Sequence, residues 1–141
     1  MKTFRPSRFW IKVFSLFTVI RGYNIAVLII AQYLTSSYIL APNTGLLNVI
    51  FDSKLFALVL ATAFSTAAGY IINNFYDAEK DKINRPKKYL LENLISQQSQ
   101  LVFYFLLNGA TLISAGFVSF NSILFFTIYI FSIWIYSSSL K

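Results

Sequence analysis

Residues 73–88 read NNFYDAEKDKINRPKK and hold three of the five carboxylates in this chain of 141 residues. Asn73, Asp77 and Asp81 recur at every fourth position, so on a helix of 3.6 residues per turn they share one face, about 6 Å apart along the axis. The run follows a long apolar segment and precedes a basic cluster. This arrangement predicts a membrane helix that emerges into the cytoplasm here, so that carboxylates, cations and a lipid boundary meet.

The composition predicts an integral membrane protein. Hydrophobic residues make up 57% of the chain and charged residues only 12%, which is too apolar for an ordinary soluble domain. Cysteine and histidine are absent, which leaves no thiol nucleophile, zinc ribbon or imidazole base. The net charge of +7 does not indicate nucleic-acid binding, because the basic residues flank apolar segments.

Four apolar segments are long enough to cross the hydrocarbon core of about 30 Å, which predicts an all-α protein with one transmembrane domain over residues 1–141. We expect the spans at about 20–40, 55–72, 101–120 and 123–136. Arg21 and Asn24 would then lie in the first turns of the first span. Residues 73–100 form a hydrophilic loop in which Asn84-Arg85-Pro86 ends the preceding helix, since proline disfavours helical geometry in the residue before it. Asn121-Ser122 forms a tight turn between the last two spans.

The basic residues predict the orientation in the membrane. Ten of the twelve group at the two termini and in the loop, which places these parts in the cytoplasm and requires an even number of spans. A prokaryotic inner membrane suits this arrangement. The ten are Lys2, Arg5, Arg8, Lys12, Lys80, Lys82, Arg85, Lys87, Lys88 and Lys141.

The carboxylate face is the candidate metal site. Two carboxylates one turn apart repel each other unless a cation lies between them, and polar residues at membrane depth are seldom placed without a role. Magnesium suits such a face because it takes one or two carboxylates together with substrate phosphate oxygens. Glu79, Lys80 and Lys82 point away from the face, so we interpret them as a solvated helix end.

These motifs resemble a known family. The pattern N-x-x-x-D-x-x-x-D at 73–81, followed by N-R-P-x-K at 84–88, is similar to the first aspartate-rich motif of the UbiA superfamily of intramembrane prenyltransferases. Arg21-x-x-Asn24 and Tyr136-x-x-x-Leu140-Lys141 resemble two further motifs of the family. Asn74 departs from the pattern, since the family often has aspartate there, and we expect Asn74→Asp to keep or modestly raise activity. Tyr89 stands where proline is frequent.

The resemblance implies a fold and a mechanism. Family members have about nine transmembrane helices and a second aspartate motif, so this chain resembles an amino-terminal half that ends after the fourth helix. The two motifs hold Mg²⁺, which binds the diphosphate of a polyprenyl donor, and loss of the diphosphate leaves an allylic cation for the acceptor. The implied roles are Mg²⁺ ligation by Asn73, Asp77 and Asp81, catalysis by Asp77 and Asp81, diphosphate binding by Arg21, Arg85 and Lys88, and donor binding by Asn24. Lys141 is either a further diphosphate ligand or a positive-inside anchor.

The function implied is transfer of a polyprenyl group to an aromatic or lipid acceptor in quinone, tetrapyrrole or lipid biosynthesis, as part of a complete enzyme. One alternative is a non-catalytic four-helix membrane subunit or pseudoenzyme. A second is a CDP-alcohol phosphotransferase, although the sequence lacks the D-G-x-x-A-R framework of that class.

Overall fold

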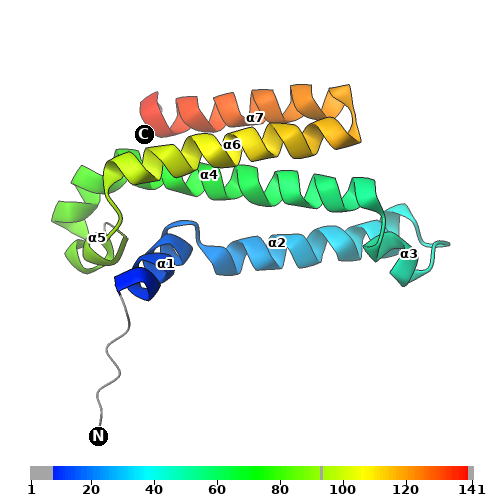
Figure 1. Cartoon of the computed structure of the whole chain (residues 1–141), viewed down its shortest axis with the longest axis horizontal. Helices are drawn as coiled ribbons and strands as arrows, with labels where there is room; N and C mark the ends of the chain where they lie inside the picture. The colour runs from blue at the N-terminus through cyan, green and yellow to red at the C-terminus, as the bar shows by residue number, and fades with distance from the viewer. Residues whose placement is uncertain (1–7, 93, 140–141) are drawn as a thin grey trace, which may run out of the picture.

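The computed structural model describes residues 8–92 and 94–139, and it is helical throughout (Figure 1). Within these residues four elements are long and apolar enough to cross a membrane, which confirms the predicted all-α fold: Gly22–Leu40, Ser53–Asn84, Gln97–Val118 and Phe120–Ser139. The helices are α1 (Arg8–Val19), α2 (Gly22–Thr35) continued by a π-helical turn η1 (Ser36–Leu40), α3 (Leu46–Ile50), α4 (Ser53–Asn84), α5 (Pro86–Glu92), α6 (Gln97–Val118) and α7 (Phe120–Ser139).

Helix α4 is the central element of the bundle. Figure 1 shows it between α2 on one side and α6 and α7 on the other. In its most apolar window 44% of the residues are buried, against 6% to 22% in the other three spans. Six of its buried residues are alanines, and at Gly69 an added Cβ would lie 3.2 Å from Ile133 of α7. Small side chains let neighbouring helices approach closely, so the composition of α4 explains its place in the middle.

A hydrophobic cluster joins three helices at the end of the bundle that carries the site. Val19 of α1 and Tyr104 of α6 pack there with buried residues of α4, including Ile71 and Ile72. Large apolar side chains elsewhere on α2, α6 and α7 are exposed, as expected for helices surrounded by lipid. The cluster lies immediately before Asn73 in α4, so the helix turn that precedes the site residues is held by packing.

Helix α4 is longer than a membrane crossing requires. It starts after Asp52, whose side chain caps the helix by accepting a hydrogen bond from the Leu55 backbone N–H. Its 32 residues rise about 48 Å at about 1.5 Å each, whereas about 20 residues cross the hydrocarbon core. The residues from Asn73 onward therefore project beyond the core as a continuation of the same helix.

The hydrophilic stretch 73–100 differs from the open loop that we expected, because most of it is helical. Helix α4 runs to Asn84, and Pro86 begins α5, at a helical position where its missing N–H costs nothing. Ser96 then caps α6 by accepting a hydrogen bond from the Ser99 N–H, which draws residues 97–100 into the helix. The predicted helix stop at Asn84-Arg85-Pro86 is present.

Two connections also differ from expectation. Arg21 does not lie in the first turn of a span but in a left-handed turn, φ 50° and ψ 55°, between α1 and α2. The last two spans are joined at Ser119 and not at Asn121-Ser122. The Ser119 hydroxyl accepts a hydrogen bond from the Ser122 N–H, and α7 starts at Phe120, three residues before the expected start at 123. Both turns depend on local caps and packing that the hydropathy pattern does not reveal. Lys2, Arg5, Leu140 and Lys141 lie outside the described residues.

Candidate functional site

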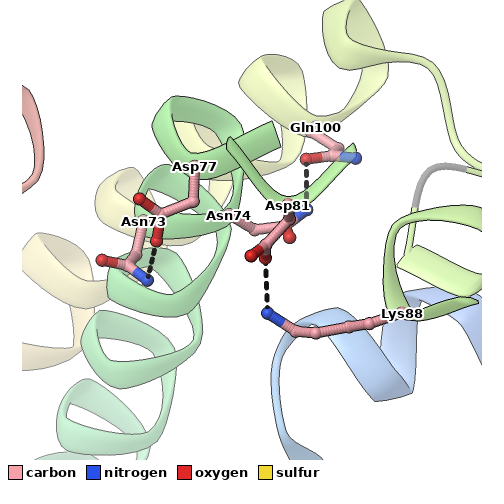
Figure 2. A network of polar contacts seen from close by, with 6 residues as sticks. All are labelled: Asn73, Asn74, Asp77, Asp81, Lys88 and Gln100. Carbon is pink, nitrogen blue, oxygen red and sulfur yellow. Dashed lines mark hydrogen bonds and ion pairs between the residues drawn. The ribbon is translucent and has the colours of Figure 1, made fainter. Parts of the chain in front are cut away.

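Asn73 and Asp77 form the first part of the site, on the projecting end of α4. The Asn73 Nδ2 donates a hydrogen bond to the Asp77 Oδ2 at 3.2 Å (Figure 2). The bond joins residues four apart, so the two side chains share one helix face as their spacing predicts. Both are half-buried. An amide oxygen and a carboxylate are thus held together at the edge of the apolar core.

Asp81 forms the second part, together with a cation from the next helix. The Lys88 Nζ lies 2.7 Å from the Asp81 Oδ2. The helix break at Arg85-Pro86 leaves α5 in contact with α4, and Figure 2 shows Lys88 reaching toward the Asp81 carboxylate. The Asp81 side chain is 17% exposed and that of Lys88 34%, so water only partly screens their attraction.

Arg21 and Asn24 form the third part, where α1 meets α2. The Arg21 guanidinium lies over the ring of Tyr70 on α4, with 5.1 Å between its central carbon and the ring centroid. The Asn24 Nδ2 donates to the Tyr70 hydroxyl at 3.2 Å. The two residues that precede and begin α2 are therefore both held against α4, one turn before Asn73.

Two hollows adjoin these residues. The first, the polar hollow, is narrow and is lined by Val19, Arg21, Tyr70, Asn73, Asn74, Asp77 and Lys88. The second, the α4–α7 cavity, has a volume of about 290 Å³ and is lined by Arg21, Thr66, Gly69, Tyr70, Asn73, Tyr129, Ile133, Tyr136 and Ser137. Four predicted site residues, from three different segments, thus converge on the polar hollow. Arg85 is exposed and lines neither hollow.

Asn74 borders the polar hollow, but its side-chain amide is bonded to α6 and not to a carboxylate. Its side chain is 7% exposed, and its Nδ2 donates to the Oε1 of Gln100 on α6 at 3.2 Å (Figure 2). The Gln100 Nε2 donates in turn to the Ile95 carbonyl at 3.3 Å. An amide suits this position because it can donate to the glutamine oxygen, which a carboxylate cannot do. The asparagine that replaces the family's aspartate thus has a hydrogen-bond partner, Gln100, in this chain.

Tyr70 is the site residue that the sequence reading missed. From the sequence it lies in the apolar span at about 55–72, where helix packing is the simplest role. Its spacing carried a signal, since it precedes Asn73 by three residues and Asp77 by seven, which places all three near one face. Tyr129, Ile133 and Ser137 of α7 were also missed, and nothing in the chain before α7 indicates that they approach α4.

The donor set is compatible with Mg²⁺ in its chemistry. No cluster of three or more His, Cys, Asp or Glu side chains occurs among the described residues. Two carboxylates and an amide oxygen are nevertheless hard donors, and Mg²⁺ completes its octahedral shell with water and phosphate oxygens. Asp81 is now paired with Lys88, so the lysine must move or share this carboxylate if a metal ion binds there.

The helices and the site together define a multi-pass integral membrane protein with a polar, charged site at one end of its spans. The model of the UbiA prenyltransferase family matches residues 30–141, and the chain belongs to this family, which confirms the predicted membership. Arg21 and Asn24 precede the matched region.

Three archaeal proteins called digeranylgeranylglyceryl phosphate synthase are similar to parts of the chain. The protein of Haloquadratum walsbyi is 43% identical over 56 residues, which are 40% of this chain and 20% of that protein. That of Thermococcus sibiricus is 33% identical over 73 residues (52% and 26%), and that of Korarchaeum cryptofilum is 36% identical over 87 residues (58% and 31%). The matched segments therefore span less than a third of the length of these relatives. No solved structure gives a significant match.

Proposed function

We propose that this chain supplies the aspartate-bearing part of a Mg²⁺-dependent site that transfers a polyprenyl group from a prenyl diphosphate to an acceptor. The observation that carries the proposal is the convergence of Arg21, Asn73, Asp77 and Lys88 on one hollow. Hard oxygen donors and cations at a lipid boundary suit a ligand with an anionic head and an apolar tail.

The residues divide the work between metal and diphosphate. Asn73, Asp77 and Asp81 would hold Mg²⁺. The bound ion would neutralise the negative charge that develops on the leaving diphosphate. Arg21 and Lys88 would bind diphosphate oxygens directly, and Asp81 aims Lys88 while the ligand is absent. Arg85, exposed at the end of α4, would meet the diphosphate from the water side. Asn24 borders the donor site through its contact with Tyr70.

The donor's tail and the acceptor would approach from the membrane. The α4–α7 cavity continues from the polar residues toward Ile133 and Tyr129, which provides an apolar wall for a prenyl chain. The three relatives are named for a glyceryl phosphate lipid, so we infer a lipid glyceryl phosphate acceptor in preference to an aromatic one. The chemistry itself lies in charge stabilisation and orientation and requires no histidine or cysteine.

The proposed topology places the site on the cytoplasmic face of a prokaryotic inner membrane. Helices α1 and α5 and the end of α7 lie at one end of the bundle and α3 lies at the other (Figure 1). Among the residues that the structure describes, most of the basic ones belong to the first end, which agrees with the positive-inside rule.

The test is binding of a prenyl diphosphate to the chain in nanodiscs, measured by calorimetry with and without Mg²⁺. Binding should require Mg²⁺ and should be lost in Asp77→Ala. Glu79→Ala is the matched control, because Glu79 is exposed and lies about 200° around the helix from Asp77. Binding that persists without Mg²⁺, or that survives Asp77→Ala, would contradict the proposal.

A further inference from the structure

We infer that Tyr70 is a positioning residue that holds Arg21 and Asn24 at the carboxylate face of α4, so that the arginine meets the diphosphate beside Asn73 and Asp77. The inference rests on the proposed function for its ligand. The family motifs name Arg21 and Asn24 but not Tyr70, and the contacts of Tyr70 with both residues come from the structure.

The first contact joins a cation to an aromatic face. The guanidinium carbon of Arg21 is 5.1 Å from the centroid of the Tyr70 ring, within the range of about 6 Å for an attractive cation–π interaction. The planar guanidinium can lie on the ring and still present N–H donors to an anion at its edge. The ring therefore fixes the position of the positive charge and leaves it un-neutralised. A carboxylate partner would neutralise it.

The second contact uses the other end of the same side chain. The Tyr70 hydroxyl accepts a hydrogen bond from the Asn24 Nδ2 at 3.2 Å. Asn24 follows Arg21 by three residues, at the start of α2. One tyrosine thus holds two points of the α1–α2 junction, and this double attachment fixes the junction's orientation as well as its distance from α4.

The backbone of the junction is shaped for this attachment. Arg21 has φ 50°, a left-handed conformation that non-glycine residues adopt only when their surroundings enforce it. The following Gly22 is buried beneath Phe17, and a Cβ added there would lie 2.0 Å from the phenylalanine ring. The ring of Phe17 therefore leaves no room for a side chain at residue 22, next to the turn that carries Arg21.

The place of Tyr70 on α4 connects this junction to the metal face. Tyr70 precedes Asn73 by one turn and Asp77 by two, and it lines both the polar hollow and the α4–α7 cavity. A ligand that spans the two hollows would pass Tyr70. Its ring would lie beside the ligand while its hydroxyl and face retain Asn24 and Arg21.

The experiment compares the affinity of the full chain in nanodiscs for inorganic pyrophosphate with Mg²⁺ among variants of this pair. Tyr70→Leu removes both contacts and should weaken binding about tenfold, close to the effect of Arg21→Ala. Tyr70→Phe keeps the ring and should stay within about threefold of the wild type. The double variant Arg21→Ala/Tyr70→Leu should bind no more weakly than Arg21→Ala alone, because the two residues act through one charge. Tyr76→Leu, at an exposed tyrosine of the same helix, is the control and should have no effect.

A second readout needs no ligand. A guanidinium held over an aromatic face has a ring-current shift of its Nε–H resonance, which Arg21→Lys would assign. The shift should remain in Tyr70→Phe and disappear in Tyr70→Leu. Additive losses of affinity in the double variant, or a shift that survives Tyr70→Leu, would overturn the inference. If the wild type binds no pyrophosphate but shows the shift, the proposed function fails while the Tyr70–Arg21 contact stands.

Discussion

Asn74 and Gln100 form a buried hydrogen bond between α4 and α6, 3.2 Å from the Asn74 Nδ2 to the Gln100 Oε1. The bond holds the Asn74 amide against α6, whereas the Asn73 amide bonds to Asp77 on α4 itself. It also engages the start of α6, because Gln100 donates its own amide hydrogen to the Ile95 carbonyl. The two amides therefore attach the start of α6, and the segment just before it, to α4.

The first prediction concerns the stability of Asn74→Asp, for which the family pattern alone suggests no loss of activity. Asn74→Asp should destabilise the protein by about 1 to 3 kcal/mol, because a carboxylate would face the Gln100 oxygen in a buried site with no donor. A turn of the Gln100 amide would provide a donor only by giving up the bond to Ile95. Thermal unfolding in detergent measures the effect. Asn121→Asp is the control, since Asn121 is exposed in the first turn of α7, where an acid is favourable. An unchanged unfolding temperature in Asn74→Asp would show that Asn74 is not held by Gln100.

The second prediction is that the loss of Lys88 changes the affinity for Mg²⁺ and the affinity for pyrophosphate in opposite directions. Lys88→Ala removes the cation that pairs with Asp81 and should raise the affinity for Mg²⁺ alone, by about fivefold at most because the pair is partly exposed. The same change should weaken the binding of pyrophosphate, which loses a cation. Calorimetric titrations with each ligand separate the two effects. Lys87→Ala, at the exposed neighbour, should alter neither titration, and a fall in Mg²⁺ affinity in Lys88→Ala would refute the competition.

The third prediction concerns rate in a complete enzyme that contains these residues. Asp77→Ala or Asp81→Ala should each lower prenyl transfer on the order of a hundredfold or more, since a charged ligand is lost beside a multiply charged diphosphate. Glu79→Ala should have little effect. Transfer of a labelled prenyl group in membranes gives the rates, with expression checked for each variant. Equal damage from Glu79→Ala and Asp77→Ala would mean that the metal is bound in another geometry.

The fourth prediction concerns residues 1–141 in isolation. We expect no prenyl transfer from this segment alone, because a single carboxylate face leaves the diphosphate's metal shell incomplete. The purified segment would be incubated with prenyl diphosphate, Mg²⁺ and either a glyceryl phosphate lipid or an aromatic acceptor. Product formation would contradict this expectation and would indicate that two copies complete one site.

The fifth prediction concerns topology. The chain contains no cysteine, so single cysteines can be introduced as labels. A membrane-impermeant maleimide should label Asn43→Cys in intact cells, and should reach Lys87→Cys only after permeabilisation. Both positions are exposed, which removes burial as a cause of a negative result. The reverse pattern would invert the proposed orientation.

Local features of the chain were predictable from the sequence by itself. The length of apolar segments predicted four spans, because the thickness of a bilayer sets how many helical residues cross it. The four-residue spacing predicted that Asn73 and Asp77 share a face, since helix geometry is the same wherever a helix forms. The helix stop at Asn84-Arg85-Pro86 followed from proline's own geometry.

The tertiary structure decided which partners these residues meet. Tyr70 and Asn24 are separated by 46 residues and Asn74 and Gln100 by 26, and no periodicity pairs residues at such distances. At the turn of Arg21, Phe17 packs over Gly22, and the turn at Ser119 uses one side-chain cap. Helical periodicity determines the direction of a side chain only relative to its own helix. What that direction meets depends on how closely the small residues of α4 allow the other helices to approach.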